Sequence, residues 1–360
     1  GIIMACHLVW AATATALRPS ALPARLPATL RPLHAQRVVT MAEAEATAST
    51  GSLPPDSFQE LISHAAESTV LAISEGSRLI EVEFPPIPVS KLDDPGLSAY
   101  DVLSANLRLC IEYCKKLQGP DGPTGGKPIA ITLPDAAELR RSQGYLGTAE
   151  PWPNVRLNSL GGDTAPSNPL AGVFGSIFKA GGAVDAVVAE WAGMYVLVGQ
   201  SCQELPTIRA LHEKAPDVPI VCFNLKLDTL RGDLGLPAFP SRDVHHTFLC
   251  KVKPVYYMRP RSYSLSLSRA PFLMSYSGVL FRRYPEGWQT LLDRGTGKSY
   301  RQVKMQEVRP ALGTFKAELT ESLRLNDAAA DSAISQAGFK QSTWWEDNKD
   351  GKDVSFEWRR

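Results

Sequence analysis

The sequence lacks the features of a membrane-spanning or disulfide-stabilised protein. No apolar run approaches the ~20 residues that a spanning helix requires, so we expect contact with a membrane surface at most. Six cysteines are scattered over 360 residues, and such a set in a long chain is not a disulfide framework. A reducing compartment fits this usage. With 44% hydrophobic and 21% charged residues, the composition is that of an ordinary globular protein.

The sequence also lacks the short motifs of common enzyme classes. It contains no GxGxxG, GxSxG or HExxH segment, so dinucleotide binding, nucleophilic hydrolysis and zincin chemistry have no specific support. The loop 122–127 superficially matches a phosphate-binding loop. However, Asp121 stands where that motif needs glycine, and Pro128 stands where it needs Ser or Thr. We interpret the segment as a plain loop before a strand, and we expect no catalytic residues and no enzyme activity.

Acidic residues are missing from positions 1–42, which contain four arginines and no Asp, Glu or Lys. Together with abundant Ala, Leu and Pro, this composition is typical of an organelle transit peptide, with a plausible cleavage region at 37–42. It fits a plastid or a mitochondrial address, and a plain disordered tail is the alternative. Residues 43–56 are expected to form a flexible linker. Removing 1–42 changes the net charge from +1 to −3, which argues against general nucleic-acid coating and DNA binding.

Beyond this leader, apolar strands alternate with amphipathic helices. Ser57 and Glu60 have the spacing of a capping box that opens a helix, and residues 78–84 are expected to form a strand with one wet face. This β-α-β-α order of apolar strands predicts an α/β fold over 57–250, with a mostly parallel, Rossmann-like sheet flanked by helices. Further strands are predicted at 128–133, 193–199 and 218–224, helices at 98–117, from 135 and at 203–215, and a long loop with one weak helix at 159–182.

The pattern changes near residue 251. Short stretches punctuated by Gly and Pro predict an antiparallel β extension of the sheet, with strands at 255–258, 263–268, 271–276, 279–284 and 288–292. A terminal helix is expected at 312–325, so that residues 251–340 complete the same domain. Residues 341–360 are interpreted as a charged tail that contains tryptophan.

The corner after the strand at 218–224 is the best small-ligand candidate. In open α/β sheets, ligands bind beyond the carboxyl ends of strands, and Asn224, Asp228, Arg231 and Asp233 follow such an end. Asn224 is expected to cap the next helix, and Asp228 and Arg231 are spaced to form an ion pair. A capped helix with a simple ion pair is the plainer interpretation.

A second candidate site is the basic segment 251–309. It carries twelve Lys and Arg residues against three acidic ones, a net charge of +9. A basic face interleaved with aromatic anchors suits an anionic partner, such as a protein surface, lipid headgroups or RNA. Solvated charges on a β surface are the alternative. The candidate partner-binding residues are Arg259, Arg261, Arg269, Arg282, Arg283, Tyr284 and Trp288.

No metal site or cofactor is predicted. Cys110 and Cys114 share a helix face, but no second Cys or His pair of suitable spacing accompanies them, so we interpret them as small core residues. His245 and His246 form the only histidine pair. Since adjacent helix residues diverge by about 100°, we expect their rings to point apart, so that both cannot easily bind one metal, and we interpret them as helix-surface or core histidines.

Four segments keep their order along the chain: RLIEVEFPPIP at 78–88, FNLKLDTLRGDLGL at 223–236, YSGVLFRRYP at 276–285 with Trp288, and TWWE at 343–346. Together they resemble the plant and algal Low PSII Accumulation protein three family, which is defined by a domain of unknown function in plastid and cyanobacterial proteins. The resemblance runs from about residue 57 to the end of the sequence. It implies a stromal, partly thylakoid-associated chloroplast protein that assists photosystem II biogenesis. The family has no established catalytic residues to carry over.

These observations support three hypotheses. The first is a non-catalytic assembly factor that helps insert or stabilise a chlorophyll-binding inner antenna subunit, with assembly intermediates or other assembly factors as partners. The second is a nucleotide- or metabolite-binding plastid enzyme that uses the corner at 224–233. The third is a plastid RNA-binding protein that uses 251–309, for which strong salt dependence is expected.

Overall fold

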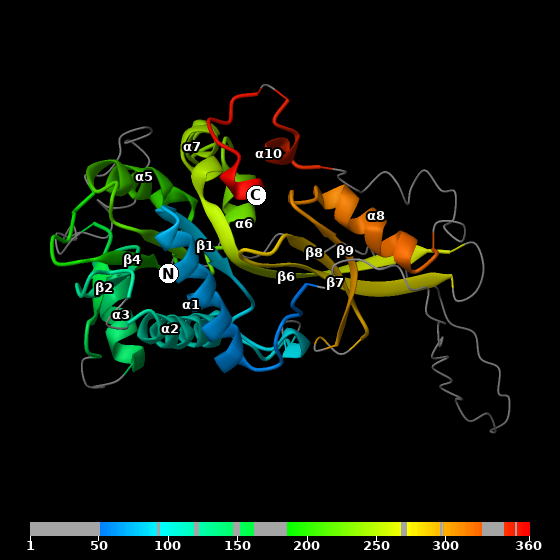
Figure 1. The fold of residues 1–360 in the computed structure, drawn as a ribbon, viewed down its shortest axis with the longest axis horizontal. Coiled ribbons are helices and arrows are strands. Elements are labelled where there is room, and N and C mark those ends of the chain that lie inside the picture. The colour runs from blue at the N-terminus through cyan, green and yellow to red at the C-terminus, as the bar shows by residue number, and fades with distance from the viewer. Residues whose placement is uncertain are drawn as a thin grey trace, which may run out of the picture. The chain divides into compact units, whose positions relative to one another are not determined.

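A mixed β-sheet of nine strands runs through the described part of the chain (Figure 1). The structure is a computed structural model. It describes residues 51–91, 94–118, 122–146, 152–161, 186–267, 272–295, 297, 299–325, 342–349 and 351–360. The expected transit peptide with its cleavage region, residues 43–50 of the linker, most of the loop at 159–182 and Arg269 lie outside these residues.

Six strands of the sheet run parallel, in the order β3-β2-β4-β5-β1-β6. Most are short apolar runs because helices cover both faces, which is usual for parallel sheets. This arrangement confirms the predicted α/β fold class. The strands are β1 (Leu79–Glu83), β2 (Ile129–Leu133), β3 (Val155–Ser159), β4 (Met194–Leu197), β5 (Ile220–Phe223) and β6 (Lys253–Ser266).

The antiparallel part begins with β6, which continues past the end of β1. It pairs with β7 (Leu273–Arg283), followed by β8 (Trp288–Asp293) and β9 (Tyr300–Gln306). The predicted breaks inside 255–268 and 271–284 are therefore wrong, since each predicted pair of short strands is mostly one long strand. Pro260 suggested a break, but it lies beyond Tyr257, the last β6 residue that pairs with β1, so its missing N–H costs no bond to that strand.

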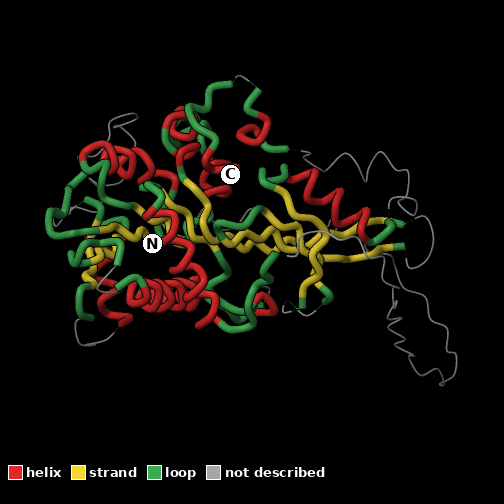
Figure 2. Tube along the Cα trace, viewed as in Figure 1, coloured by secondary structure: helices red, strands yellow, loops and turns green. Residues whose placement is uncertain are grey.

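Helices cover both faces of the parallel strands, and Figure 2 shows the yellow strands running between the red helices. One core cluster joins alternate strand residues to α1 and α2, with buried Cys110 and Cys114 among its members. A second cluster lies on the other face against α5, α6 and α7. The helices are α1 (Phe58–Ser74), α2 (Ala99–Lys116), α3 (Ala136–Leu146), α5 (Leu205–Lys214), α6 (Leu227–Asp233), α7 (Asp243–Thr247), α8 (Leu312–Ser322) and α10 (Trp344–Asp347), with short 3₁₀ turns at Val89–Lys91, Cys202–Glu204, Leu249–Lys251 and Glu357–Arg359.

Local capping follows the sequence at the first two helices. Ser57 accepts a hydrogen bond from the Glu60 backbone N–H at the start of α1, which confirms the cap and one half of the predicted capping box. Ser98 forms a reciprocal capping box with Asp101 at the start of α2. None of the described helices is long and apolar enough to cross a bilayer.

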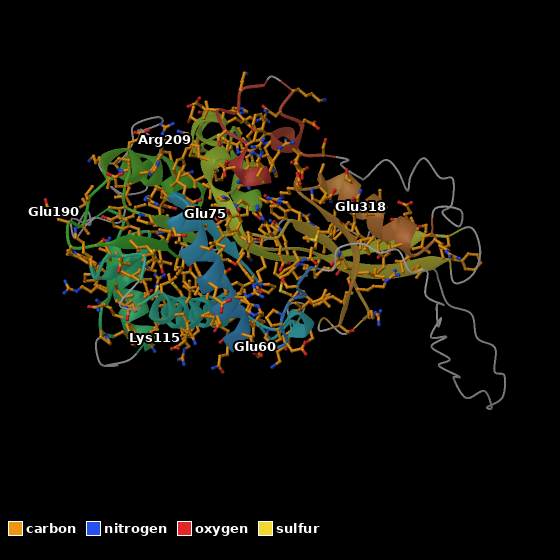
Figure 3. The ribbon with its side chains drawn as sticks, in the orientation of Figure 1. Glu60, Glu75, Lys115, Glu190, Arg209 and Glu318 are labelled. Atoms are coloured by element: carbon orange, nitrogen blue, oxygen red, sulfur yellow. The ribbon has the colours of Figure 1, made fainter. Side chains whose placement is uncertain are left out.

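Helix α8 packs on the antiparallel strands. Its Glu318, labelled in Figure 3, accepts a 2.6 Å hydrogen bond from Thr290 on β8 and lies 3.0 Å from the ammonium group of Lys304 on β9. Opposite the helix, Gly278 of β7 leaves no room for a side chain, because a Cβ there would come within 2.6 Å of Leu319. The absence of a side chain at Gly278 is what allows this close approach.

Strand β1 departs from its expected wet face. Ile80 and Val82 point into the α1–α2 core, while Glu81 and Glu83 point to the opposite face, on the side of α6, and are buried as well. The carboxyl end of β1 is also a topological switch point. The chain leaves β1 toward β2 in one direction, whereas the chain leaving β5 crosses β1 in the other direction to reach β6.

Candidate functional site

Asp228 is the centre of a buried ion network at this switch point. Its side chain is only 7% exposed, in the first turn of α6. Its Oδ1 accepts a hydrogen bond from Arg231 at 2.9 Å. Its Oδ2 accepts from Arg309 at 2.5 Å and from the Tyr257 hydroxyl at 3.0 Å, and lies 3.2 Å from an Nη1 of Arg259. Both oxygens of the carboxylate are therefore held by positively charged or hydroxyl donors.

Segments far apart in the sequence supply these donors. Tyr257, Arg259 and Arg261 alternate along β6, so their side chains leave the same face of the strand. The outermost of them, Arg261, lies 3.8 Å from Asp228. Arg309 comes after β9, and its backbone N–H donates to the Arg359 carbonyl at 2.8 Å. The network thus ties α6, β6, the segment after β9 and the C-terminal tail together.

Two carboxylic acids of β1 border the network. Burial raises the pKa of Glu81 to about 8, against the opposing effect of Arg231, so this group is largely protonated at neutral pH. Neither Glu81 oxygen has a hydrogen-bond partner among the described residues. Glu83 lies 3.6 Å from an Nη1 of Arg259. The pKa of Glu81 thus lies near neutrality, but the residue is only 1% exposed.

The charges of the network are unequal in number. Burial by itself would raise the pKa of Asp228, but Arg309, Arg259 and Arg231 outweigh it and hold this pKa well below its usual range. Together with Arg261, these arginines bring four guanidinium groups to the two carboxylates of Asp228 and Glu83. Within the described part of the chain, Nε of Arg231 and both Nε and Nη1 of Arg309 lack a hydrogen-bond acceptor.

Aromatic rings take up part of this surplus positive charge. The Arg309 guanidinium lies 4.8 Å from the centre of the Tyr257 ring and 5.1 Å from that of Trp288, and Arg231 lies 5.1 Å from the ring of Trp358. Such cation–π contacts strengthen when they are desolvated. The network is therefore a cation-rich cluster between aromatic faces. Arg259 and Arg261 are its most accessible cations, with side chains about a quarter exposed.

The predicted ligand corner is only partly assembled. Asp228 and Arg231 form the expected ion pair inside the network. Asn224 is not the helix cap, since Lys226 occupies that position. The Asn224 side chain instead accepts from the Phe84 N–H at 2.8 Å and donates to Asn106 at 2.7 Å, which fastens the end of β1 to α2. Asp233 makes no hydrogen bond or ion pair with the described residues of the network. Burial raises the pKa of its carboxyl group.

The predicted basic face is divided between several places. Arg259 and Arg261 join Asp228, so the two candidate sites of the sequence meet in one network. Trp288 and Arg282, two of the candidate partner-binding residues, are 0% and 4% exposed and so present almost no surface to a partner. The indole N–H of Trp288 donates to the Arg359 carbonyl at 2.9 Å. An RNA platform needs accessible rings for stacking, and Trp288 offers none.

The remaining residues of that set make local contacts. Arg283 pairs with Glu67 of α1 at 2.8 Å. The Tyr284 hydroxyl donates to Glu75, and both Lys253 and Arg282 make cation–π contacts with the Tyr284 ring. These contacts attach α1 to the end of β7.

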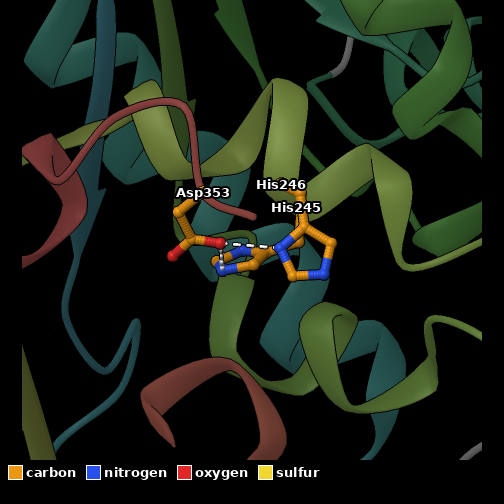
Figure 4. Close-up of side chains that lie close together, drawn as sticks. All are labelled: His245, His246 and Asp353. Carbon is orange, nitrogen blue, oxygen red and sulfur yellow. Dashed lines mark hydrogen bonds and ion pairs between the residues drawn. The ribbon is translucent and has the colours of Figure 1, made fainter. Parts of the chain in front are cut away.

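The expectation that the two adjacent histidines point apart is wrong. His246 Nδ1 lies 2.7 Å and His245 Nε2 lies 3.5 Å from the same carboxylate oxygen of Asp353 (Figure 4). Their ligand atoms all lie within 4.8 Å of one another. No local spacing signals this cluster, because Asp353 comes from the tail more than a hundred residues later.

The fold and the site define an α/β protein whose parallel sheet carries an antiparallel extension. A buried aspartate–arginine network closes the switch point of this sheet. A family model described as Domain of unknown function (DUF1995) matches residues 55–317, and the chain belongs to this family. The matched range contains the network from Glu81 to Arg309 and ends before Asp353. Comparisons with curated proteins and with solved structures found no match.

Proposed function

We propose that this protein is a non-catalytic assembly factor of the chloroplast stroma that assists photosystem II biogenesis by protein–protein contact at the thylakoid surface. The observation that carries the proposal is the saturation of Asp228, at the edge of the sheet where α/β enzymes usually bind substrates. The resemblance of four segments to the Low PSII Accumulation protein three family supports the choice of process. The client that it suggests is a chlorophyll-binding inner antenna subunit.

The chemistry of the corner favours contact over catalysis. A general acid or base works best with a pKa near the operating pH. Asp228 has a pKa held far below that range, and burial, as the largest influence, raises the pKa of Tyr257 above its usual value. Glu81 has a suitable pKa but is enclosed by the protein. The same contacts make the sheet and its extension one rigid scaffold, which suits a protein that presents a surface to a partner.

The hairpin of β6 and β7 offers such a surface. Strand β8 pairs with β7 only from Gly278 to Phe281, so the outer part of the hairpin extends past β8 (Figure 1). At its outer end Phe272 and Leu273 are 65% and 59% exposed. Exposed apolar side chains at a projecting end are typical of a contact with a protein or membrane surface. We assign the docking of assembly intermediates to this end of the hairpin.

Disruption of the gene, followed by pulse-labelling of thylakoid proteins, tests the function. We expect newly made inner antenna subunits to accumulate poorly and recovery when the wild-type gene is restored. The double variant Phe272→Ser, Leu273→Ser is expected to restore less, whereas Leu236→Ser, which alters an exposed apolar residue after α6, should restore fully. Normal photosystem II accumulation in the disrupted strain would remove the proposal.

A second candidate function is the binding of an anionic metabolite or nucleotide by the Asp228 network. The surplus of guanidinium groups, with unpaired N–H groups on Arg231 and Arg309 among the described residues, favours it. Thermal-shift measurements with inorganic phosphate and with nucleotides test this candidate. A rise in melting temperature that disappears in Arg261→Gln would support it. A rise that persists in Arg261→Gln, or none, would count against it.

A further inference from the structure

The cluster of His245, His246 and Asp353 plays no part in the function proposed above. The histidines come from α7 and the aspartate from the C-terminal tail. Figure 4 shows both rings directed at the carboxylate, with the dashed contacts converging on one oxygen. Two imidazoles and a carboxylate aimed at one point form a donor set, whereas a structural hydrogen bond would need only one of the rings.

The most enclosed member of the cluster is also the least satisfied. The His245 side chain is 0% exposed, and neither of its ring nitrogens has a hydrogen-bond partner among the described residues. The Asp353 side chain is equally buried, and its Oδ2 has no hydrogen-bond partner there either. Buried polar groups in folded proteins nearly always find partners. His245 Nε2 thus faces the buried carboxylate of Asp353 without a hydrogen bond, which indicates that a further ligand binds between them.

The surroundings suit a bound ion. The Trp344 and Trp358 rings stand edge-on to His245 at centroid distances of 5.4 and 5.5 Å, which forms an aromatic wall around the donors. His246 is 16% exposed on its side chain and gives the cluster an edge at the surface. The nearby guanidinium of Arg231 is directed at Asp228, and that of Arg359 donates to the Trp345 carbonyl at 3.2 Å. These two neighbouring cations are thus engaged by other partners.

The donor types select the ion. Imidazole nitrogens suit zinc and the neighbouring transition metals, whereas magnesium and calcium prefer oxygen ligands throughout. Tetrahedral zinc with bonds of about 2.0–2.1 Å places its ligand atoms about 3.3 Å apart. The 3.5 Å separation of His245 and Asp353 fits this spacing. The 2.7 Å separation of His246 and Asp353 has to open by roughly half an ångström on metal binding.

We propose that His245, His246 and Asp353 bind one divalent transition-metal ion of the zinc class, and that this ion fastens the C-terminal tail to α7. Other contacts also hold the tail, among them the Val354 N–H donating to the His246 carbonyl at 3.0 Å and the Trp288 indole N–H donating to the Arg359 carbonyl. With three protein ligands, the ion keeps a further position for water or another ligand. Such an ion links α7, which lies inside the matched range 55–317, to the C-terminal tail, which lies beyond it.

The test uses the full chain, purified without a polyhistidine tag. Metal content is measured directly, and zinc affinity is measured against a chromophoric chelator. We expect about one zinc per chain, a higher melting temperature with zinc but not with magnesium, and affinity at least about tenfold weaker in Asp353→Asn. His64→Gln, on α1 and outside the cluster, is the matched control and should bind as the wild type does.

Asp353→Asn keeps the size of the side chain, and its fold is checked by circular dichroism. Hydrogen exchange of residues 351–360 gives an independent measurement, with zinc expected to slow exchange in the wild type but not in the variant. If the metal-free chain neither binds zinc nor changes its melting temperature, or if Asp353→Asn binds zinc as tightly as the wild type, the proposal is overturned. The cluster is then an internal hydrogen-bond pair of His246 and Asp353.

Discussion

The Tyr257 hydroxyl of β6 donates a 3.0 Å hydrogen bond to Asp228 of α6, across the edge where β1 ends. The same hydroxyl accepts a hydrogen bond from Arg309 at 2.9 Å. A tyrosine thus orders the donors around a buried carboxylate and joins the parallel part of the sheet to the segment after β9.

Tyr257→Phe removes this hydroxyl and keeps the ring over which Arg309 lies. We expect a loss of about 1.5–3 kcal/mol in the free energy of unfolding, the usual range for a hydrogen bond to a charged group. Urea denaturation followed by circular dichroism measures the change. Tyr256→Phe is the matched control on the same strand, because its buried hydroxyl has no hydrogen-bond partner among the described residues, and it should change stability by less than about 0.5 kcal/mol. Equal effects of the two substitutions would contradict the role given to Tyr257.

Asp228→Asn removes the charge that Arg231, Arg259 and Arg309 surround. Breaking a buried ion pair on one side usually costs about 3–5 kcal/mol, because the remaining charges are left uncompensated. We expect a loss of this size in the same denaturation assay. Asp217→Asn, in the loop before β5, offers an exposed carboxylate for comparison and should be nearly neutral. A loss below about 1 kcal/mol for Asp228→Asn would show that the network contributes little.

Glu81 predicts a specific pH dependence of stability. Its folded pKa of about 8 lies above the ordinary glutamate value of 4.5. The stability associated with its protonated form is therefore fully present below about pH 4.5 and is lost as the pH rises through about 8. Glu81→Gln removes this titration, so the variant should gain stability relative to the wild type as the pH rises from about 5 to about 8, by about 1.4 kcal/mol for each unit of pKa difference. Parallel stability curves would refute the burial of an ionisable Glu81.

Gly278 and Gly144 predict opposite responses to alanine. A Cβ at Gly278 would come within 2.6 Å of Leu319 and 2.7 Å of the Leu291 carbonyl oxygen, so Gly278→Ala should cost about 1–3 kcal/mol through overpacking. At Gly144, within α3, a Cβ meets nothing within 4 Å, and Gly144→Ala should stabilise by roughly 0.5–1 kcal/mol. Thermal unfolding of both variants checks the pair. No loss of stability in Gly278→Ala would contradict the packing of α8 on β7, and a loss in Gly144→Ala would contradict the open space beside α3.

Most of the parallel half of the fold could be predicted from the sequence because its signals are local, but strand β3 could not be, since its sequence VRLNS carries little apolar signal. Buried runs such as Ile129–Leu133 are apolar on both faces, and a helix cap such as Ser57 stands within three residues of its partner. The long strands of the extension could not be predicted, because a proline such as Pro260 usually interrupts a strand. Only the structure shows that β6 has no neighbour on its β1 side at this residue. Strand β9 could not be predicted either, since its alternating polar residues carry little apolar signal.

The candidate site could be predicted only in part, for the same reason. Asp228 and Arg231 are neighbours on a helix turn, and their ion pair follows from spacing. Arg309 reaches Asp228 from 81 residues away, and Asp353 reaches His246 from 107 residues away. Such contacts depend on how the sheet is ordered. The charge of Glu81 suggests a strand with one solvent-facing side. In the structure β1 lies between β5 and β6 inside the sheet, and both of its faces are buried.

The outer half of β6 has a consequence for the way a partner can attach. Past Tyr257, one long side of this strand has no neighbouring strand in the described part of the chain, which leaves an edge where a foreign peptide could add itself to the sheet. Pro260 supplies no N–H on that edge, and the arginines on either side place charge beside it. Strand addition is thereby discouraged. A client is expected to be recognised by the side chains at the hairpin's end, and released without any change in the ladder of main-chain bonds behind them.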